Sequence, residues 1–325
     1  MIEKDFYHIC NSILRFKTLE IIQNLEQYYP QKPLVLSIGM FDGVHRGHQG
    51  IIHKINNIAQ EMQWESAILT FTPHPRLVFN PNDNLKLLNT LDEKIYLLDK
   101  ANIQNLFIQN FDENFRNISG EDFIREILVK KLNVKYLIIG HDHTFGKNKS
   151  GDFRLLKQLS SELGYQVEQI DAFSIHHQTI SSTKIRNALL NSNILEANNM
   201  LNYHYAISGE VINGKKLGRT IGYPTANIRV EDCKLLPKNG AYIVDVFIDN
   251  YKFKGMLSIG TNPTVNGKNI SIEVHILDFR QDIYGKKIRV EFRDFLHEEI
   301  KFESLEGLIQ RLDKDKKLTE DFFSN

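Results

Sequence analysis

The sequence predicts an α/β domain built on a doubly wound parallel sheet, followed by a small antiparallel β-barrel and a terminal helix. Up to residue 171, short apolar runs alternate with helical patterns, which is typical of strand–helix–strand crossover units. After residue 204, apolar and polar residues alternate with period two between turn residues, which indicates antiparallel strands. A chain of 325 residues is long enough for two domains, each with its own core.

Five apolar runs predict the strands of the parallel sheet, at 34–38, 67–71, 106–108, 136–139 and 165–170. The helices between them are expected near 47–62, 91–100, 120–132 and 152–163. Thr90-x-x-Glu93 is a capping box that begins the second of these helices. Ligands of such sheets gather beyond the carboxyl ends of the strands, so we expect a site in the loops 39–48, 72–76, 140–151 and 174–184.

The second half shows period-two strands at 242–248, 270–276 and 288–292. Turn residues fall between them at Asp249-Asn250, Asn266-Gly267 and Tyr284-Gly285. A helix near 303–316 ends the pattern, and a helical stretch at 183–201 precedes it. The predicted domains are therefore 1–190 and 204–325, joined by a helical connector at 191–203.

Composition narrows the class of protein. Apolar residues make up 42% and charged residues 25%, as in ordinary globular chains, and 40 basic residues balance 40 acidic ones. A net charge of zero argues against a nucleic-acid or membrane-surface partner. The two cysteines suggest no disulfide framework, and no signal-peptide core or run of ~18 apolar residues is present. We expect a cytoplasmic protein with small-molecule substrates.

A glycine-rich stretch with two histidines, Gly39–His48, follows the first expected strand and precedes a helix. Such a turn directs backbone N–H groups and the positive end of the helix dipole at one spot, which suits phosphate. His45 and His48 add donors that can stabilise charge on a reacting phosphate, so the stretch predicts nucleotidyl transfer. The phosphate-binding residues expected beside them are Gly39, Phe41, Asp42, Gly43 and Gly47.

The stretch is also compatible with other chemistries. Its glycine spacing matches neither the dinucleotide fingerprint G-x-G-x-x-G nor the Walker A loop. The two histidines could instead cap a turn or bind zinc, although no cysteine lies close in sequence. Of these alternatives we favour phosphate binding.

Three further loops carry candidate residues. In Thr72–Arg76, two prolines stiffen a loop whose His74 and Arg76 could fix an anionic group, or which is an ordinary exposed loop. Asp142, after the fourth strand, could hold a hydroxyl group or a magnesium ion, or mark a metallohydrolase. At the start of a later helix, Ser182, Thr183 and Arg186 form either a triphosphate clamp or an ordinary helix cap.

A second glycine-rich region opens the barrel half. Its glycines and Arg219 suit ATP phosphates, and the glycines recur every four residues at Gly214, Gly218 and Gly222. Thr225 and Asn227 offer neutral oxygens for Mg²⁺ and share one side of an extended segment. Glu273 lies on the polar face of its strand, where it is either simply solvated or a general base.

The order and spacing of the first-half motifs resemble the FMN adenylyltransferase module of bacterial bifunctional riboflavin kinase/FAD synthetases. The resemblance implies that the FMN phosphate attacks the α-phosphorus of ATP and that pyrophosphate leaves. It further implies that His45 and His48 stabilise the transition state, while Asp142 holds the adenosine or flavin side. On the same resemblance, His74 and Pro75 are candidates for flavin or nucleotide binding. His143 departs from the aromatic residue that many relatives have there.

Gly218–Asn227, with the segments around Glu273 and Asp282–Gly285, resembles the riboflavin kinase half of the same family. The resemblance implies a six-stranded barrel, attack of the ribityl 5′-hydroxyl on the γ-phosphorus of ATP, Mg²⁺–ATP binding by Thr225 and Asn227, and proton abstraction by Glu273. His297 stands where relatives usually place arginine, which could weaken flavin or phosphate capture.

Three hypotheses follow from the sequence. The leading one is a single chain that converts riboflavin to FMN and FMN to FAD, with one ATP for each step. The second is a chain with only one active module, and the third is a flavin-binding sensor or carrier without turnover.

Overall fold

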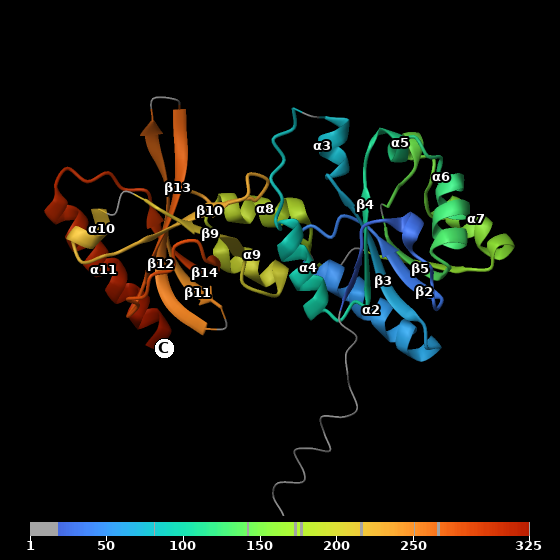
Figure 1. The fold of residues 1–325 in the computed structure, drawn as a ribbon, viewed down its shortest axis with the longest axis horizontal. Coiled ribbons are helices and arrows are strands. Elements are labelled where there is room, and N and C mark those ends of the chain that lie inside the picture. Colours follow the sequence, from blue (N-terminus) through green and yellow to red (C-terminus); the bar gives the residue numbers. More distant parts are fainter. Residues whose placement is uncertain are drawn as a thin grey trace, which may run out of the picture. The chain divides into compact units, whose positions relative to one another are not determined.

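The computed structural model describes residues 19–80, 82–141, 143–171, 174–175, 178–214, 217–249, 251–264 and 267–324. Contacts divide the chain into two compact units (Figure 1). The first unit contains Lys94–Thr179 and the chain up to Asn84, and the second contains Leu85–Glu93 and the chain from Ile180 onward. The predicted boundaries at 190 and 204 concern functional modules and stay a prediction.

The first unit is built on a six-stranded sheet in the order β1-β4-β3-β2-β5-β6, with every pair parallel. The strands are β1 (Glu20–Ile22), β2 (Leu34–Ile38), β3 (Glu65–Thr72), β4 (Asn105–Asn110), β5 (Val134–Gly140) and β6 (Gln166–Ile170). The predicted doubly wound sheet is confirmed. Only β1 was missed, because a strand of three residues leaves no usable pattern.

Helices connect these strands. They are α2 (Arg46–Met62), α3 (Pro75–Phe79), α4 (Leu91–Lys100), α5 (Glu113–Arg116), α6 (Gly120–Asp122) and α7 (Phe153–Leu163). Shorter or irregular pieces are the 3₁₀ helices η1 (Leu25–Gln27) and η3 (Lys147–Lys149), the π-helix η2 (Phe123–Lys131), and the hairpin strands β7 (Ser174–Ile175) and β8 (Gln178–Thr179). The helix expected over 120–132 is α6 followed by the wider π-helix η2.

The core of the first unit explains the apolar runs. Leu34, Leu36, Leu69 and Leu137 have no exposed surface and come from three adjacent strands. A parallel sheet has both faces covered, so its strands are continuously apolar instead of alternating.

The strand order places a topological switch point between β2 and β5. From β2 the chain steps to β3 and β4 on one side, and it then returns to add β5 and β6 on the other side. At such a point the loops after the two neighbouring strands diverge and leave a crevice for a ligand. The loops concerned are those after Ile38 and Gly140, which carry the two histidine-containing motifs.

The second unit is a closed antiparallel barrel in the order β10-β13-β12-β11-β14-β9, which confirms six strands. They are β9 (Ala206–Ile212), β10 (Ala226–Val230), β11 (Gly240–Ile248), β12 (Tyr251–Thr264), β13 (Gly267–Ile276) and β14 (Lys287–Glu298). Its helices are α8 (Ser182–Leu190), α9 (Ile194–Leu201), α10 (Leu217–Thr220) and α11 (Leu305–Ser324). Figure 1 shows α11, drawn in red, along the outside of the barrel against β12.

The barrel strands alternate only in part as predicted, since Ile243 and Asp245, on the opposite face of β11 from Tyr242, are also buried. Ile272, Val274 and Ile276 point into the core, whereas Ile270 is 56% exposed although it was grouped with them. The terminal helix continues to Ser324, well beyond the expected end at 316, and the expected helical stretch at 183–201 is divided into α8 and α9.

Two candidate active sites

The loop between β2 and α2 has a strained backbone. Phe41 (φ 47°) and Val44 (φ 37°) adopt left-handed conformations, as does Gly43 between them (φ 87°). A β-branched residue at positive φ is an outlier that persists only when packing enforces it. Packing does so here, because Phe41 and Val44 are each only 2% exposed. Strain of this kind concentrates at functional sites.

The two histidines of this loop lie against each other at the start of α2. Their rings stack with centroids 3.7 Å apart and planes 15° apart. Nδ1 of His45 accepts a hydrogen bond from the backbone N–H of His48 at 3.4 Å, so His45 also caps the helix. Because Nδ1 is an acceptor, the ring proton of neutral His45 resides on Nε2, which remains a donor. Helix capping and phosphate binding are therefore compatible functions of this residue.

Burial keeps both imidazoles neutral. It lowers the pKa of His45 to about 4, and it lowers the pKa of His48 well below the ordinary value, with smaller contributions from His45 and Lys94. Nδ1 of His48 is buried and has no hydrogen-bond partner among the described residues. Two neutral imidazoles beside a helix N-terminus form a donor-rich place for an anion without a large desolvation cost for charged side chains.

An aromatic cavity of about 390 Å³ lies beside the loop that follows β5. It is lined by Ile38, Phe71, Pro75, Phe79, Phe111, Phe115, Arg116, Ile118, Phe123, His143, Thr144, Phe145, Gly146, Asn148 and Lys149. The loop is held close to α6, since a Cβ on Gly146 (φ +73°) would lie 2.5 Å from the backbone nitrogen of Gly120. His143 stacks on Phe145 with ring centroids 5.8 Å apart. Asp142, the predicted site residue of this loop, lies outside the described residues.

The two predicted residues of the Pro73–Pro75 loop, His74 and Pro75, have different surroundings. Pro75 lines the aromatic cavity, whereas Nδ1 of His74 accepts from the backbone N–H of Arg76 at 3.1 Å and caps α3. Arg76 pairs with Asp83. The flavin- or nucleotide-binding role of His74 stays a prediction.

The segment Ser181–Arg186 belongs to the second compact unit. The hydroxyl of Ser181 accepts from the backbone N–H of Lys184 at 3.3 Å, so the helix-cap interpretation holds for Ser181. Ser182 and Thr183 follow in the first turn of α8, and Nε of Arg186 donates to the carbonyl of Lys86 at 2.9 Å. The triphosphate-binding role of Ser182, Thr183 and Arg186 stays a prediction.

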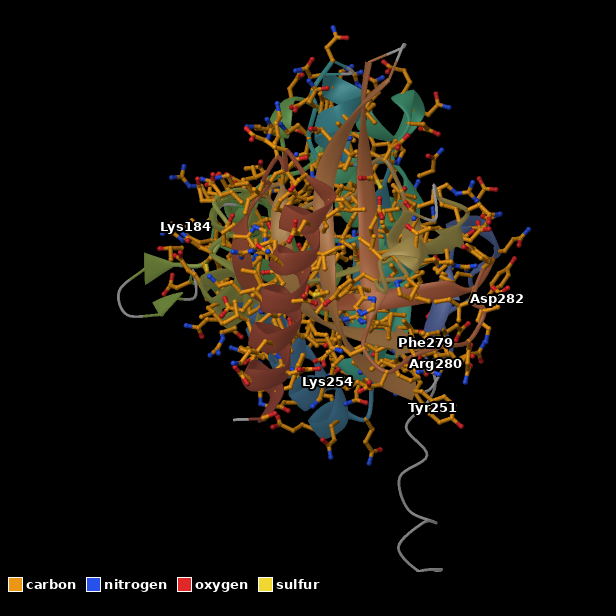
Figure 2. The ribbon with its side chains drawn as sticks, turned by 90° about the vertical axis from the view of Figure 1, so that its left-hand side faces the viewer. Lys184, Tyr251, Lys254, Phe279, Arg280 and Asp282 are labelled. Atoms are coloured by element: carbon orange, nitrogen blue, oxygen red, sulfur yellow. The ribbon has the colours of Figure 1, made fainter. Side chains whose placement is uncertain are left out.

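The barrel has its own cavity, with a volume of about 500 Å³. Its lining comes from β9, β10, β13 and the segment after β13, and it includes Arg219, Thr225, Phe279, Arg280, Asp282 and Tyr284. Figure 2 labels Phe279, Arg280 and Asp282 of that segment. A guanidinium nitrogen of Arg219 donates to the phenol oxygen of Tyr284 at 3.3 Å across this cavity's rim.

Three predicted residues converge at the start of β10. The hydroxyl of Thr225 donates to Oε2 of Glu273 at 2.9 Å, and Asn227 is the direct cross-strand partner of Glu273. Gly214 lies under the Asn227 side chain, because a Cβ there would lie 2.1 Å from Nδ2 of Asn227. Gly218 approaches the carbonyl of Tyr223 equally closely, so these glycines are required for close packing. Gly222 takes a left-handed turn at φ +85°.

Two residues near this site were not predicted from the sequence. Nδ1 of His275 lies 2.8 Å from the carbonyl oxygen of Pro224, which fixes the segment just before Thr225. Burial lowers the pKa of His275, so the neutral ring donates from Nδ1 to this carbonyl. The other residue is Tyr284, which contacts Arg219. Alternation placed His275 on the correct face, but no pattern indicated its partner.

His297 has a structural partner. Its Nε2 lies 2.8 Å from Oδ2 of Asp315 on α11, and Arg311 contacts the other oxygen of Asp315 at 2.9 Å. His297 therefore helps fasten α11 to the barrel. The predicted effect of this residue on flavin or phosphate capture stays a prediction.

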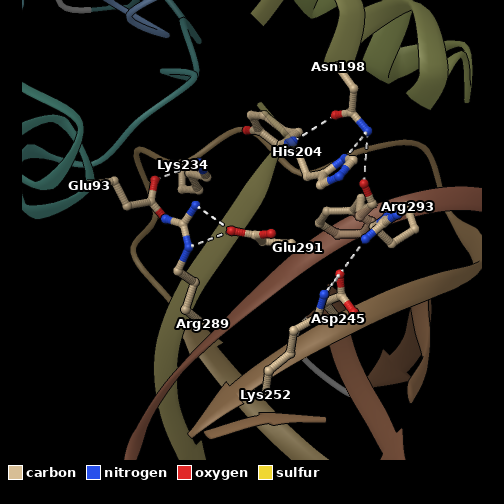
Figure 3. Close-up of polar contacts among 11 residues, drawn as sticks. Glu93, Asn198, His204, Lys234, Asp245, Lys252, Arg289, Glu291 and Arg293 are labelled. Carbon is tan, nitrogen blue, oxygen red and sulfur yellow. Dashed lines mark hydrogen bonds and ion pairs between the residues drawn. The ribbon is translucent and has the colours of Figure 1, made fainter. Parts of the chain in front are cut away.

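Buried charges elsewhere in the second unit are paired (Figure 3). Arg293 and Lys252 both contact Asp245, which is 1% exposed, at 2.6 and 3.0 Å. Within the described parts of the chain, no three His, Cys, Asp or Glu side chains are grouped so that they could hold a metal ion. Over the same residues, no helix has the length and apolar character needed to cross a membrane.

Comparison with known proteins assigns the two halves. The FAD synthetase family matches residues 28–184, and the riboflavin kinase family matches residues 201–323. A crystal structure described as a macrolide-efflux protein from Streptococcus pneumoniae shares the fold with a TM-score of 0.85 and 30% identity, covering 93% of this chain and 99% of that one.

Curated relatives match nearly the whole chain. Proteins named bifunctional riboflavin kinase/FMN adenylyltransferase from Haemophilus influenzae and Listeria monocytogenes are 40% and 38% identical over 89% of this chain, covering 94% and 92% of their own lengths. The protein of that name from Escherichia coli strain K12 is 36% identical over 94% of this chain and 98% of its own. The chain therefore belongs to the family of bifunctional riboflavin kinase/FMN adenylyltransferases.

Proposed function

We propose that this chain phosphorylates riboflavin to FMN in its barrel unit and adenylylates FMN to FAD in its parallel-sheet unit, with ATP as the donor in both reactions. The observation that carries the proposal is that each compact unit has its own cavity and its own candidate catalytic side chains. Family membership over both halves supports the same pair of activities.

For adenylyl transfer, an FMN phosphate oxygen attacks the α-phosphorus of ATP, and the bond to the pyrophosphate oxygen breaks. Negative charge develops on the α-phosphate oxygens in the transition state. The Nε2–H of His45 and the N-terminal N–H groups of α2 are donors already fixed in place by capping and ring stacking. Preorganised donors of this kind stabilise developing charge without reorganisation during the reaction.

The aromatic cavity supplies a place for the flavin of this reaction. Its phenylalanine rings suit the flat, largely apolar isoalloxazine ring, since aromatic rings pack favourably in offset or edge-to-face contacts. Arg116 and Lys149 at its rim offer positive charge for the FMN phosphate. Pro75 is the residue of this wall that the sequence predicted for flavin or nucleotide binding, and His143 lines the cavity as well.

For the kinase reaction, the ribityl 5′-hydroxyl attacks the γ-phosphorus of ATP, the bond from that phosphorus to the β,γ-bridging oxygen breaks, and ADP leaves. Glu273 accepts the proton of the attacking hydroxyl. The hydrogen bond from Thr225 orients the Glu273 carboxylate before substrate binds. Thr225 and Asn227 would hold Mg²⁺ through neutral oxygens, which fits an ion that takes its remaining ligands from water and phosphate. When bound, Mg²⁺ neutralises part of the triphosphate charge.

A dual-product assay tests the proposal. The full chain is incubated with riboflavin, ATP and Mg²⁺, and the flavins are separated by chromatography. FMN should appear first and FAD after it, with inorganic pyrophosphate formed in proportion to FAD. Accumulation of FMN alone would contradict adenylyl transfer, and tight flavin binding without ATP consumption would contradict both reactions.

A further inference from the structure

Lys94 is a buried lysine that the mechanism above does not use. It lies on α4 in the first unit and is only 6% exposed. Lysine is rarely buried this completely without a paired carboxylate, because removing an ammonium group from water is costly. The desolvation cost of a buried ammonium group is therefore expected to be offset by a function.

The contacts of Lys94 leave most of its hydrogen-bonding capacity unused. Its Nζ donates to the hydroxyl of Thr70 at 3.3 Å, and that hydroxyl donates to the carbonyl of Met40 at 3.3 Å. Met40 begins the strained loop that leads to the histidine pair. Among the residues that the structure describes, Lys94 makes no ion pair, although an ammonium group has three donors.

The ionisable groups that face Lys94 belong to the candidate adenylyl-transfer site. Asp42 on the β2–α2 loop raises the pKa of Lys94, but burial outweighs this contribution and lowers that pKa to about 8. Lys94 in turn contributes to the low pKa of His48, which stacks on His45 at the start of α2. Lys94 thus lies close enough to the Asp42 carboxylate and the His48 imidazole to act on the same region electrostatically.

We propose that Lys94 is a positioning residue for adenylyl transfer: its buried charge, held by Thr70, makes the β2–α2 loop attractive to the phosphates of ATP. This inference rests on the proposed reaction of the first unit. The physical reason is that a charge in a partly dehydrated interior acts over several ångströms with little screening. Bound phosphate would supply the negative charge that the structure does not pair directly with Lys94.

Two variants test the inference. Lys94→Met removes the charge at nearly constant volume and should slow FAD formation by about 10- to 100-fold, with no change in riboflavin phosphorylation. Lys94→Arg keeps a positive charge and should restore part of the rate. Lys100→Met, an exposed position of the same helix, is the matched control and should behave as wild type.

The pH profile separates an electrostatic role from mere packing. In the wild type, kcat/KM for FAD formation should fall as Lys94 loses its proton above a pH of about 8. Lys94→Met should lack this fall, and Lys94→Arg should move it to higher pH. A wild-type rate for Lys94→Met, or a slow rate with the alkaline fall unchanged, would overturn the inference.

Binding of pyrophosphate keeps this test independent of turnover. Titration calorimetry with pyrophosphate should give a dissociation constant about 10-fold weaker for Lys94→Met than for wild type or Lys100→Met. Equal affinities would reject the role of Lys94 even if FAD is formed. A wild type that binds pyrophosphate in a Lys94-dependent way but makes no FAD would instead reject the proposed reaction.

Discussion

Two buried lysines, one in each compact unit, have opposite surroundings. Lys234 of the barrel unit contacts Glu93 at 2.6 Å, donates to the carbonyl of Leu88, and lies 4.3 Å from the ring centroid of Tyr205. Within the described part of the chain, the hydroxyl of Thr70 is the hydrogen-bond partner of Lys94 in the sheet unit, and no carboxylate forms an ion pair with it. Lys234 thus has a contacting carboxylate, which Lys94 lacks among these residues.

The comparison of Lys234 with Lys94 distinguishes a buried charge that stabilises the fold from one that is available to a ligand. A buried cation with a carboxylate, a carbonyl and an aromatic face is complete without a ligand, so its removal affects folding. A buried cation without a contacting counterion destabilises the folded state, and its charge is available to bind an anionic ligand. The candidate catalytic residues of the two units differ in a similar way. His45 and His48 of the sheet unit are neutral imidazoles, whereas the Glu273 carboxylate of the barrel unit accepts a hydrogen bond from Thr225.

The largest expected effect is on the rate of riboflavin phosphorylation, when Glu273 of the barrel is replaced. Glu273→Ala should reduce riboflavin phosphorylation by about 10²- to 10⁴-fold, because the attacking hydroxyl loses its proton acceptor. FAD formation from supplied FMN should continue at the wild-type rate. The two rates are measured separately by chromatography of the flavins, and an unchanged kinase rate would make Glu273 an ordinary surface residue.

Breaking the buried ion pair between Glu93 and Lys234 should affect the stability of the fold and not the rate of either reaction. Glu93→Gln leaves the charge of Lys234 buried without its carboxylate and should lower the free energy of unfolding of the barrel unit by about 3–5 kcal/mol. The matched control is Glu298→Gln, whose exposed pair with Lys238 is screened by water, so that its loss should change the free energy of unfolding far less. Urea denaturation measures both, and equal costs would contradict the contrast between buried and exposed pairs.

The histidine pair provides the corresponding test in the sheet unit. His48→Ala should reduce FAD formation by about 10²- to 10³-fold, the usual loss when one preorganised donor to a developing anion is removed. Riboflavin phosphorylation serves as the internal control. If FAD formation proceeds at the wild-type rate without His48, the imidazole has only a structural role.

The smallest expected effect is a gain in the free energy of unfolding when Lys94 is replaced by methionine. The pKa of Lys94 is lowered from 10.5 to about 8, so the folded state disfavours its charge. The penalty is complete below pH 8, decreases between pH 8 and 10.5 as only the folded state loses the proton, and vanishes above. Lys94→Met should therefore raise the free energy of unfolding by about 1–3 kcal/mol at pH 7, with a smaller gain at pH 9.5. Thermal unfolding at both pH values measures this, and a destabilised variant at pH 7 would contradict it.

Much of the fold could be predicted from local pattern. The strand Leu34–Ile38 and the helix Leu91–Lys100 have the predicted bounds, because an apolar run and a capping box are signals within a few residues. The capping box forms with Thr90 and Glu93 bonded in both directions at 3.1 and 3.3 Å. The π-helix Phe123–Lys131 could not be predicted, since its pattern resembles that of an α-helix.

The candidate sites were predicted unevenly. The sequence identified the residues whose neighbours are close in the chain or in a strand register, such as His45 with His48 and Asn227 with Glu273. It gave no indication of Lys94, because a lysine in an amphipathic helix is ordinarily exposed.

The sequence by itself determined the two classes of architecture, the glycine-rich phosphate-type loops and the family, because periodicity and motif spacing are properties of neighbouring residues. Only the tertiary structure decided which charged groups are buried and which of those have partners. Burial and pairing depend on residues far apart in the chain, as Lys94 with Thr70 and Lys234 with Glu93 demonstrate.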